Sequence, residues 1–412
     1  MIGVNSKLPA RRLSILSAGF FLISFLILAL RTGDWHGYVL AVSVPVLILI
    51  GARLLPGVFR LDDMLVGFMH FFCALGILIA YRLEPASASR QILYYGIGLL
   101  LMLLASRLVR ALHAGGAAPI VLIPIALAIA ALPLIPGLCV PGRPGEIMIG
   151  AFSFLPFWPA LMASVLACAP LMKRRRTLVW LIFALLMAAV LALGQDYTGA
   201  LIFLTVVLCL FWASYGKFPL FLLGLALICG LAAAAYRFSP ALQEMLRVWR
   251  EPATAMTPLG NQVVQGLIAV STGGLFGTGL GLGDPALIPG YMDASVFAVL
   301  LEQFGIIFGL CVLLLYAGLI WRCTTAAVSA GRCVHGLIAS GCVAILGIQI
   351  LLSVGGVLCV IPFTGVSLPF ISNNGTCIIM SMFALGLIHG VHALYREDIT
   401  EFSHISLFGG AQ

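Results

Sequence analysis

The ionisable side chains that could carry chemistry are few, and they lie within or at the edges of long apolar segments. Glu302 is about seven residues inside the apolar segment 295–320, roughly 10 Å deep at 1.5 Å per residue. An acid at that depth is costly, which makes it a functional candidate; a structural hydrogen bond to a neighbouring helix is the alternative. On the next segment Ser353 reaches a comparable depth, and Gln349 lies about one turn deeper. We therefore expect Glu302 beside one of them in an outward-facing polar cavity.

Three further acids lie in predicted turns: Asp196, Asp284 and Asp293. A carboxylate in such a position either acts as a general base or caps a helix or forms a turn. Asp is among the best N-cap residues, so we expect an Asp293 oxygen to accept from the backbone N–H of Ser295 or Val296. The alternative is that its carboxylate points into a central cavity near Arg247 or Arg250 and acts as a base.

Arginines on the same side of the chain can bind phosphate through paired N–H donors, or can anchor at lipid headgroups. They are Arg82, Arg90, Arg143, Arg247 and Arg250. The eleven cysteines lie mostly in apolar segments and form no CxxC pair, so we expect them to pack and predict no metal site.

Composition indicates what must position these residues. Of 412 residues, 62% are hydrophobic and only 9% are charged, against roughly 25% charged residues in soluble domains. This excludes a water-soluble globule. Apolar segments long enough to cross about 30 Å of hydrocarbon predict an all-α polytopic membrane bundle of about twelve transmembrane helices. The predicted spans are 13–30, 38–55, 64–81, 92–106, 118–135, 156–172, 177–194, 198–215, 219–235, 295–320, 336–361 and 377–395.

Basic residues predict the orientation of this bundle. With both termini in the cytoplasm, fifteen of the 22 Lys and Arg residues lie inside, including the run 173–176, as the positive-inside rule favours. The scattered placement of the other charges argues against a nucleic-acid partner. The one long connection, 236–294, is then external, and long loops tend to be functional.

The loop 236–294 contains three features. SPALQEMLRVWREP predicts a short amphipathic helix in the headgroup layer, 262–270 predicts a second helix, and STGGLFGTGLGLGD predicts a flexible backbone. The glycine spacing imitates a phosphate-binding loop, but no Lys-Ser/Thr follows it, so we predict a re-entrant turn and no nucleotide site. PFTGVSLPFISNNG, residues 362–375, lies between the last two spans, where irregular backbone implies a polar pocket opening outward.

Several segments, in order, resemble the SEDS family (shape, elongation, division and sporulation; RodA/FtsW/SpoVE-like). They are GNQVVQGLIAVSTGGLFGTGLGLGDPALIPG, SVFAVLLEQFGIIFGL and LLSVGGVLCVIPFTGVSLPFISNNG. The resemblance implies a ten-helix core over 64–395, which leaves residues 1–63, with the first two spans, as an N-terminal extension and 396–412 as a cytoplasmic tail.

The resemblance implies a peptidoglycan glycosyltransferase of the bacterial cytoplasmic membrane. It would polymerise lipid II, an undecaprenyl-pyrophosphate-linked precursor, at the outer leaflet together with a class B penicillin-binding protein. This chemistry requires a carboxylate to take a hydroxyl proton and cations to hold the departing diphosphate. The resemblance does not imply a particular cofactor, and a divalent cation would be compatible with this reaction.

The chain offers candidates for both roles. The catalytic candidates are Asp293, Glu302 and Asp196. The substrate-binding candidates are Arg143, Arg247, Arg250, Gln262, Gln349 and Ser353.

Departures from the family pattern leave a second hypothesis open. In a gapless alignment Ala294 stands at the position of the family's essential Asp, one residue after Asp293, and Gln303 replaces the second Glu of a family pair. The usual Gln, Glu and Lys are replaced upstream by Leu155, Trp158 and Leu161. The chain is therefore either an active polymerase or a catalytically inactive paralogue that binds the lipid-linked precursor or a division partner. Lipid II transport is a third hypothesis.

Overall fold

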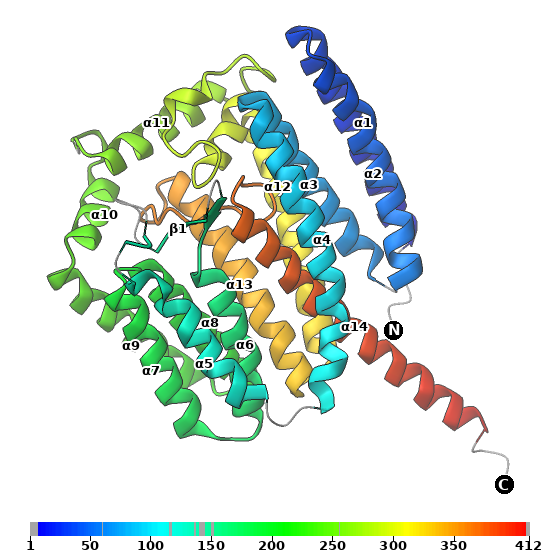
Figure 1. Cartoon of the computed structure of the whole chain (residues 1–412), viewed down its shortest axis with the longest axis vertical. Coiled ribbons are helices and arrows are strands. Elements are labelled where there is room, and N and C mark those ends of the chain that lie inside the picture. The colour runs from blue at the N-terminus through cyan, green and yellow to red at the C-terminus, as the bar shows by residue number, and fades with distance from the viewer. Residues whose placement is uncertain are drawn as a thin grey trace.

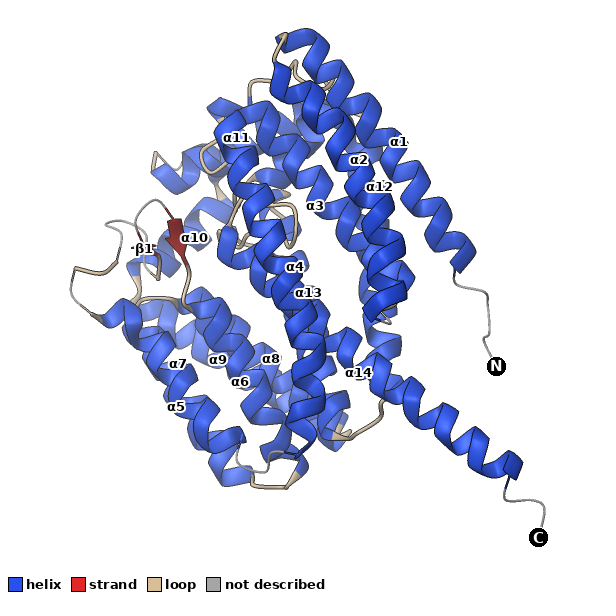
Figure 2. Ribbon diagram, turned by 45° about the vertical axis from the view of Figure 1, so that its right-hand side comes forward, coloured by secondary structure: helices blue, strands red, loops and turns tan. Residues whose placement is uncertain are grey.

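Long helices run back and forth through one bundle (Figures 1 and 2). The computed structural model describes residues 7–59, 61–114, 118–135, 137–139, 145–149, 152–254 and 256–408. The α-helices are α1 (Lys7–Thr32), α2 (Trp35–Phe59), α3 (Asp63–Leu83), α4 (Pro85–Ala114), α5 (Ala118–Ala131), α6 (Phe157–Lys173), α7 (Thr177–Leu193), α8 (Tyr197–Tyr215), α9 (Phe218–Phe238), α10 (Pro240–Arg250), α11 (Pro258–Gly273), α12 (Val296–Ser329), α13 (Val334–Val357) and α14 (Gly375–Phe408).

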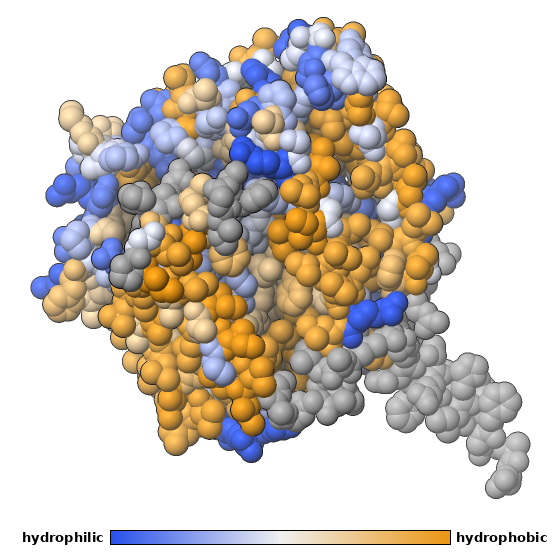
Figure 3. Space-filling model, in the orientation of Figure 1, coloured by the Kyte–Doolittle hydropathy of each residue, from blue (hydrophilic) through white to orange (hydrophobic). Residues whose placement is uncertain are grey.

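The lengths of these helices fit a membrane bundle. Within the described residues, nine helices are at least 18 residues long and apolar enough to cross a membrane, and α5, α6 and α7 are shorter apolar helices. Each coincides with one of the twelve predicted spans, so the predicted fold class is confirmed. Figure 3 shows apolar side chains over the middle of the molecule and polar ones gathered toward its ends.

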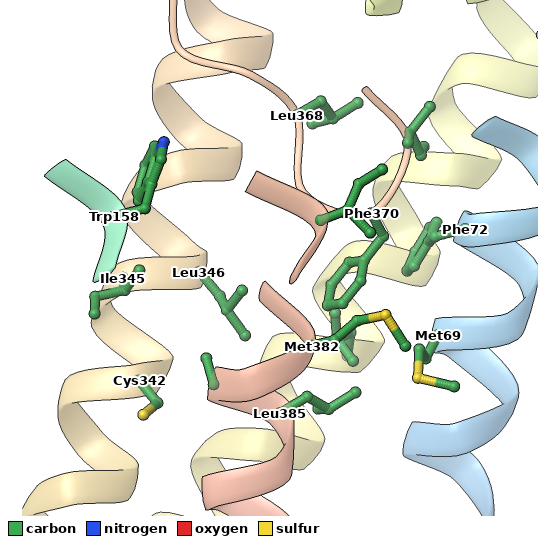
Figure 4. Close-up of a cluster of buried hydrophobic side chains, with 14 of the residues drawn as sticks. Met69, Phe72, Trp158, Cys342, Ile345, Leu346, Leu368, Phe370, Met382 and Leu385 are labelled. Atoms are coloured by element: carbon green, nitrogen blue, oxygen red, sulfur yellow. The ribbon is translucent and has the colours of Figure 1, made fainter. Parts of the chain in front are cut away.

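The core lies where α3, α6, α12, α13 and α14 meet (Figure 4). The rings of Phe72 and Tyr316 stack with centroids 4.0 Å apart, and the Tyr316 hydroxyl donates to the carbonyl of Pro369 over 2.5 Å. Small residues let α4 and α14 approach closely, since a Cβ at Gly386 would lie 2.2 Å from the Met102 carbonyl oxygen. This packing fixes the loop that precedes α14.

α12 is broken near its start, at Gly305, whose φ of 81° and ψ of 172° suit glycine alone. The glycine-rich segment fills the break. The amides of Thr278 and Gly279 donate to the carbonyls of Glu302 and Gln303, and the amides of residues 306 and 307 donate to the carbonyls of residues 274 and 275. Four bonds across the break thus replace the helical ones, as buried backbone requires.

The smaller elements are partly as expected. α10 coincides with the predicted amphipathic helix, and α11 contains the predicted helix 262–270. A short antiparallel hairpin of β1 (Ile147–Ile149) and β2 (Phe152–Phe154), which pairs Met148 with Ser153, was not predicted. α14 continues through Phe408, into the predicted tail, and projects beyond the bundle (Figure 2).

Candidate functional site

Asp293 lies in a polar cluster just before α12, where the chain meets the loop 362–375. Its carboxylate accepts hydrogen bonds from the hydroxyl of Ser367 and from Asn374 Nδ2, the latter over 3.2 Å. The Ser372 hydroxyl donates to the backbone carbonyl of Asp293 over 3.0 Å. The half-buried carboxylate is therefore oriented by two side chains of the loop.

The predicted capping role of Asp293 is wrong. The N-cap of α12 is Ser295, and its side chain makes no cap bond. The backbone amides of Ser295 and Val296, which an Asp293 cap would bind, donate to backbone carbonyls instead. The Ser295 amide donates to Gly290 over 3.1 Å, and the Val296 amide donates to the carbonyl of Asp293 itself over 3.4 Å. The Asp293 side chain instead bonds to Ser367 and Asn374 of the loop.

Two predicted substrate-binding residues reach this cluster. Gln349, buried on α13, donates from Nε2 to the carbonyl of Ser367 over 3.0 Å, and so supports a residue that holds Asp293. Gln262 on α11 donates from Nε2 to Ser295 Oγ over 3.0 Å, two residues after Asp293. Two helices, the turn before α12 and the loop 362–375 thus supply polar groups to one place.

Glu302 is buried on α12 and turns toward the glycine-rich segment. Its Oε1 accepts from the backbone amide of Asp284 over 3.2 Å, while Oε2 is buried with no hydrogen-bond partner in the described part of the chain. No hydrogen bond among the described residues joins Glu302 to Gln349 or Ser353, the two residues expected beside it. Gln349 bonds to Ser367, and the buried Ser353 hydroxyl makes no hydrogen bond among the described residues. Equal depth fixes the height of a residue and not the direction of its side chain.

Asp196 has a separate environment at the start of α8. It is the N-cap of that helix, with Oδ1 accepting from the Gly199 amide over 2.8 Å. Burial raises the pKa of this carboxyl above its ordinary value, and the Gly199 bond only partly opposes that rise. Its carboxyl lines a small cavity beside Phe157 and Leu191 that no residue of the Asp293 cluster lines.

Arg247 and Arg250 lie on α10 and line a cavity of about 550 Å³. α10 packs through its buried Leu242 and Val248, which leaves the arginines on the open side. Asp293 does not line this cavity, so the alternative placement of Asp293 near these arginines is not supported either. Arg143 lies outside the described residues.

A second polar cluster, which the sequence did not suggest as a site, lies near the opposite end of α12. Arg322 donates to Asp62 Oδ2 from Nε over 3.1 Å and from Nη2 over 2.7 Å. The Asp62 amide donates to His389 Nδ1 over 3.2 Å, and His392 Nε2 lies 3.9 Å from Asp62 Oδ2. Burial would raise the pKa of Asp62, but the Arg322 guanidinium more than offsets this and lowers it. The available signal is an acid pair before an apolar segment, which indicates only a helix start.

Among the residues that the structure describes, no group of three or more His, Cys, Asp or Glu side chains could hold an ion.

Comparison with known proteins identifies the family of the chain. The family model of the FtsW, RodA and SpoVE type, described as "Cell cycle protein", matches residues 56–397. The chain belongs to this SEDS family. It is 33% identical over 177 residues to stage V sporulation protein E of Bacillus subtilis, covering 42% of this chain and 47% of that protein. It is 28% identical over 216 residues to peptidoglycan glycosyltransferase RodA of Mycobacterium leprae, covering 52% and 46%.

The chain spans about half the length of the two relatives just named. Its match to a solved structure covers more of both chains. It covers 98% of a chain in a structure described as "Structural coordination of polymerization and crosslinking by a peptidoglycan synthase complex", with 27% identity and a TM-score of 0.67 over 81% of this chain. The family match begins at residue 56, so α1 and most of α2 precede it.

Proposed function

We propose that this SEDS member is a peptidoglycan glycosyltransferase that polymerises lipid II at the outer face of the bacterial cytoplasmic membrane. Membership of the family and the activity printed in the name of its RodA relative support the proposal. The observation that carries it is the state of Asp293. Although Ala294 occupies the family's acidic position, the neighbouring carboxylate is not used as a helix cap and is held by Ser367 and Asn374.

In the proposed reaction Asp293 is the general base. It takes the proton from the attacking glycan hydroxyl, whose oxygen bonds to the first carbon of the donor sugar as the bond from that carbon to the diphosphate breaks. The hydrogen bonds from Ser367 and Asn374 orient the carboxylate. Gln349 supports the loop 362–375 through Ser367, and Gln262 supports the turn before α12 through Ser295. A positioned base contributes about 10²–10⁴-fold in rate.

The remaining candidates are assigned by their chemistry. Arg247 and Arg250 line a cavity that Asp293 does not line, and there they would bind the diphosphate of a lipid II molecule, since guanidinium N–H pairs match phosphate oxygens. Glu302 is the second carboxylate, because its buried Oε2 has no described protein partner. Asp196 and Ser353 remain more remote candidates. We propose a class B penicillin-binding protein as partner, as the synthase complex of the matched structure suggests.

The test measures glycan strands made from lipid II by the purified full-length protein, with and without its candidate transpeptidase. Asp293→Asn keeps the shape of the side chain but cannot take a proton, so we expect polymerisation to fall by at least about 100-fold. Glu84→Gln, an exposed acid between α3 and α4, is the matched control and should keep its rate. Melting temperatures verify that each variant is folded.

Two results would overturn the proposal. Full activity in folded Asp293→Asn would remove Asp293 as the base. No product from the wild type under any of these conditions, together with retained lipid II binding, would establish the inactive paralogue instead.

A further inference from the structure

The helix pair α1–α2 lies almost entirely before the family match but packs against the family core. The two helices form an antiparallel pair beside α3 (Figures 1 and 2). The Phe20 ring of α1 lies 6.2 Å from that of Phe304 and stacks on that of Phe308 at 5.5 Å, on both sides of the break in α12. This anchors α1 to the segment that carries Glu302.

The end of α1 also holds the glycine-rich segment directly. Arg31 Nη1 donates to the carbonyl of Leu280 over 2.9 Å. Arg82, at the end of α3, donates from Nη2 to the carbonyls of Gly281 and Gly283 over 2.9 and 3.4 Å. A Cβ on Gly281 would lie 3.4 Å from Leu28 Cδ1 and 3.3 Å from Arg82 Nε, so the segment is wedged between the two helices.

The connection between α1 and α2 is tied to α3 at the same level. Asp34 accepts from the Tyr81 hydroxyl over 2.8 Å, and Tyr81 immediately precedes Arg82. The hydrogen bonds from His36 and Tyr81 lower the pKa of Asp34 and so favour its ionised form. Arg31 and Arg82 therefore approach the glycine-rich segment from two helices whose ends are joined.

The held segment continues to the carboxylate of Glu302. The amide of Asp284, one residue after Gly283, donates to Glu302 Oε1 over 3.2 Å. A Cβ on Gly283 would lie 2.6 Å from the Glu302 carboxyl carbon, so the backbone presses directly on the carboxylate. Displacement of 280–284 would take away both the hydrogen bond and the wall of the Glu302 site.

We propose that α1–α2 is a positioning element of the active site, in which Arg31 holds residues 280–284 and through them fixes the carboxylate of Glu302. The inference rests on the proposed function for its catalytic consequence. Arg31 touches neither Glu302 nor the Asp293 cluster among the described contacts, so it is a positioning residue. The helix pair thus completes a site that the family core alone leaves without this support.

The experiment compares Arg31→Gln, Arg31→Lys and Arg237→Gln with the wild type as full-length proteins. Arg237 is the matched control, an exposed arginine in the last turn of α9 that makes no hydrogen bond in the described part of the chain. Two quantities are measured: amide hydrogen exchange over 277–284, and kcat and KM for lipid II polymerisation.

We expect Arg31→Gln to raise exchange in 277–284 and to lower kcat about fivefold with little change in KM, since one charge-assisted hydrogen bond is lost away from the substrate. Arg31→Lys, which can still donate to the Leu280 carbonyl, should recover most of both quantities. Arg237→Gln should match the wild type.

The two readouts separate this inference from the proposed function. Unchanged exchange in Arg31→Gln would refute the positioning role whatever the activity. Raised exchange with unchanged kcat would show that Arg31 only stabilises residues 280–284, and it would overturn the proposed effect of Arg31 on catalysis. If no variant or wild type polymerises lipid II, the proposed function fails, whereas the exchange result still decides whether Arg31 holds the segment.

Discussion

Asp293 shows how much one side chain depends on its surroundings. Its residue type and its place before a helix fit both a helix cap and a general base, and the strong N-cap preference of Asp favours the cap. The turn 290–295 argues against the cap. The backbone carbonyls of Gly290 and Asp293 accept hydrogen bonds from the two amides that a capping side chain would bind. The partners Ser367 and Asn374 lie more than seventy positions later, so no local pattern around Asp293 indicates them.

Asp62 provides a prediction at the same scale. Its pKa is lowered by Arg322 despite burial, so folding favours the ionised form. The resulting stability is fully present above the ordinary pKa of 3.8 and is lost as pH falls through the lowered, folded value. We expect the melting temperature of Asp62→Asn in detergent to lie below that of the wild type at pH 7, and the difference to shrink as pH falls below 3.8.

Asp62→Asn keeps the backbone hydrogen bond from residue 62 to His389 and leaves both His389 and His392 in place, while it removes the negative charge beside them. The double variant Asp62→Asn/Arg322→Gln provides the control, because it should cost less than the sum of the single changes. A constant difference between wild type and Asp62→Asn down to pH 2 would contradict the assignment.

Among the elements, α12 and the glycine-rich segment form one unit. The sequence predicted a re-entrant turn with a flexible backbone, but the structure gives its glycines a specific partner. Gly277 and Gly305 lie against each other, with a Cβ on Gly305 only 2.4 Å from the Gly277 amide nitrogen. Periodicity could not reveal this, because Gly305 reads as an ordinary residue of an apolar span.

We predict that Gly305→Ala destabilises the protein strongly. Alanine at φ 81° and ψ 172° costs about 1–3 kcal/mol in backbone strain alone, and its Cβ would also clash with residues 275–277. The matched control is Gly347→Ala on α13, where a Cβ meets nothing within 4 Å and helix propensity improves. Thermal unfolding in detergent should show a lowered melting temperature only for Gly305→Ala. Equal melting temperatures would contradict the role of the break.

At the scale of the whole molecule, hydropathy predicted the twelve spans because crossing hydrocarbon is a property of each segment alone. What it could not provide is the rotation of each helix about its axis. Glu302 and Gln349 illustrate this: both are buried, yet one turns to Asp284 and the other to Ser367. The family resemblance located the candidate residues, and only the packing assigned them to separate clusters.

The orientation of the bundle in the membrane is the last prediction. Charge distribution places both termini in the cytoplasm and the connection between α9 and α12 outside. The structure indicates where to label: Ser239 is buried as the N-cap of α10, whereas Met256 is fully exposed in that connection and Ser329 is exposed as the last residue of α12. A membrane-impermeant maleimide applied to intact cells should label Met256→Cys at once and Ser329→Cys only after lysis, with the parent protein reporting the native cysteines. The opposite pattern would invert the topology and place the Asp293 cluster on the cytoplasmic side, where an outer-leaflet polymerase cannot work.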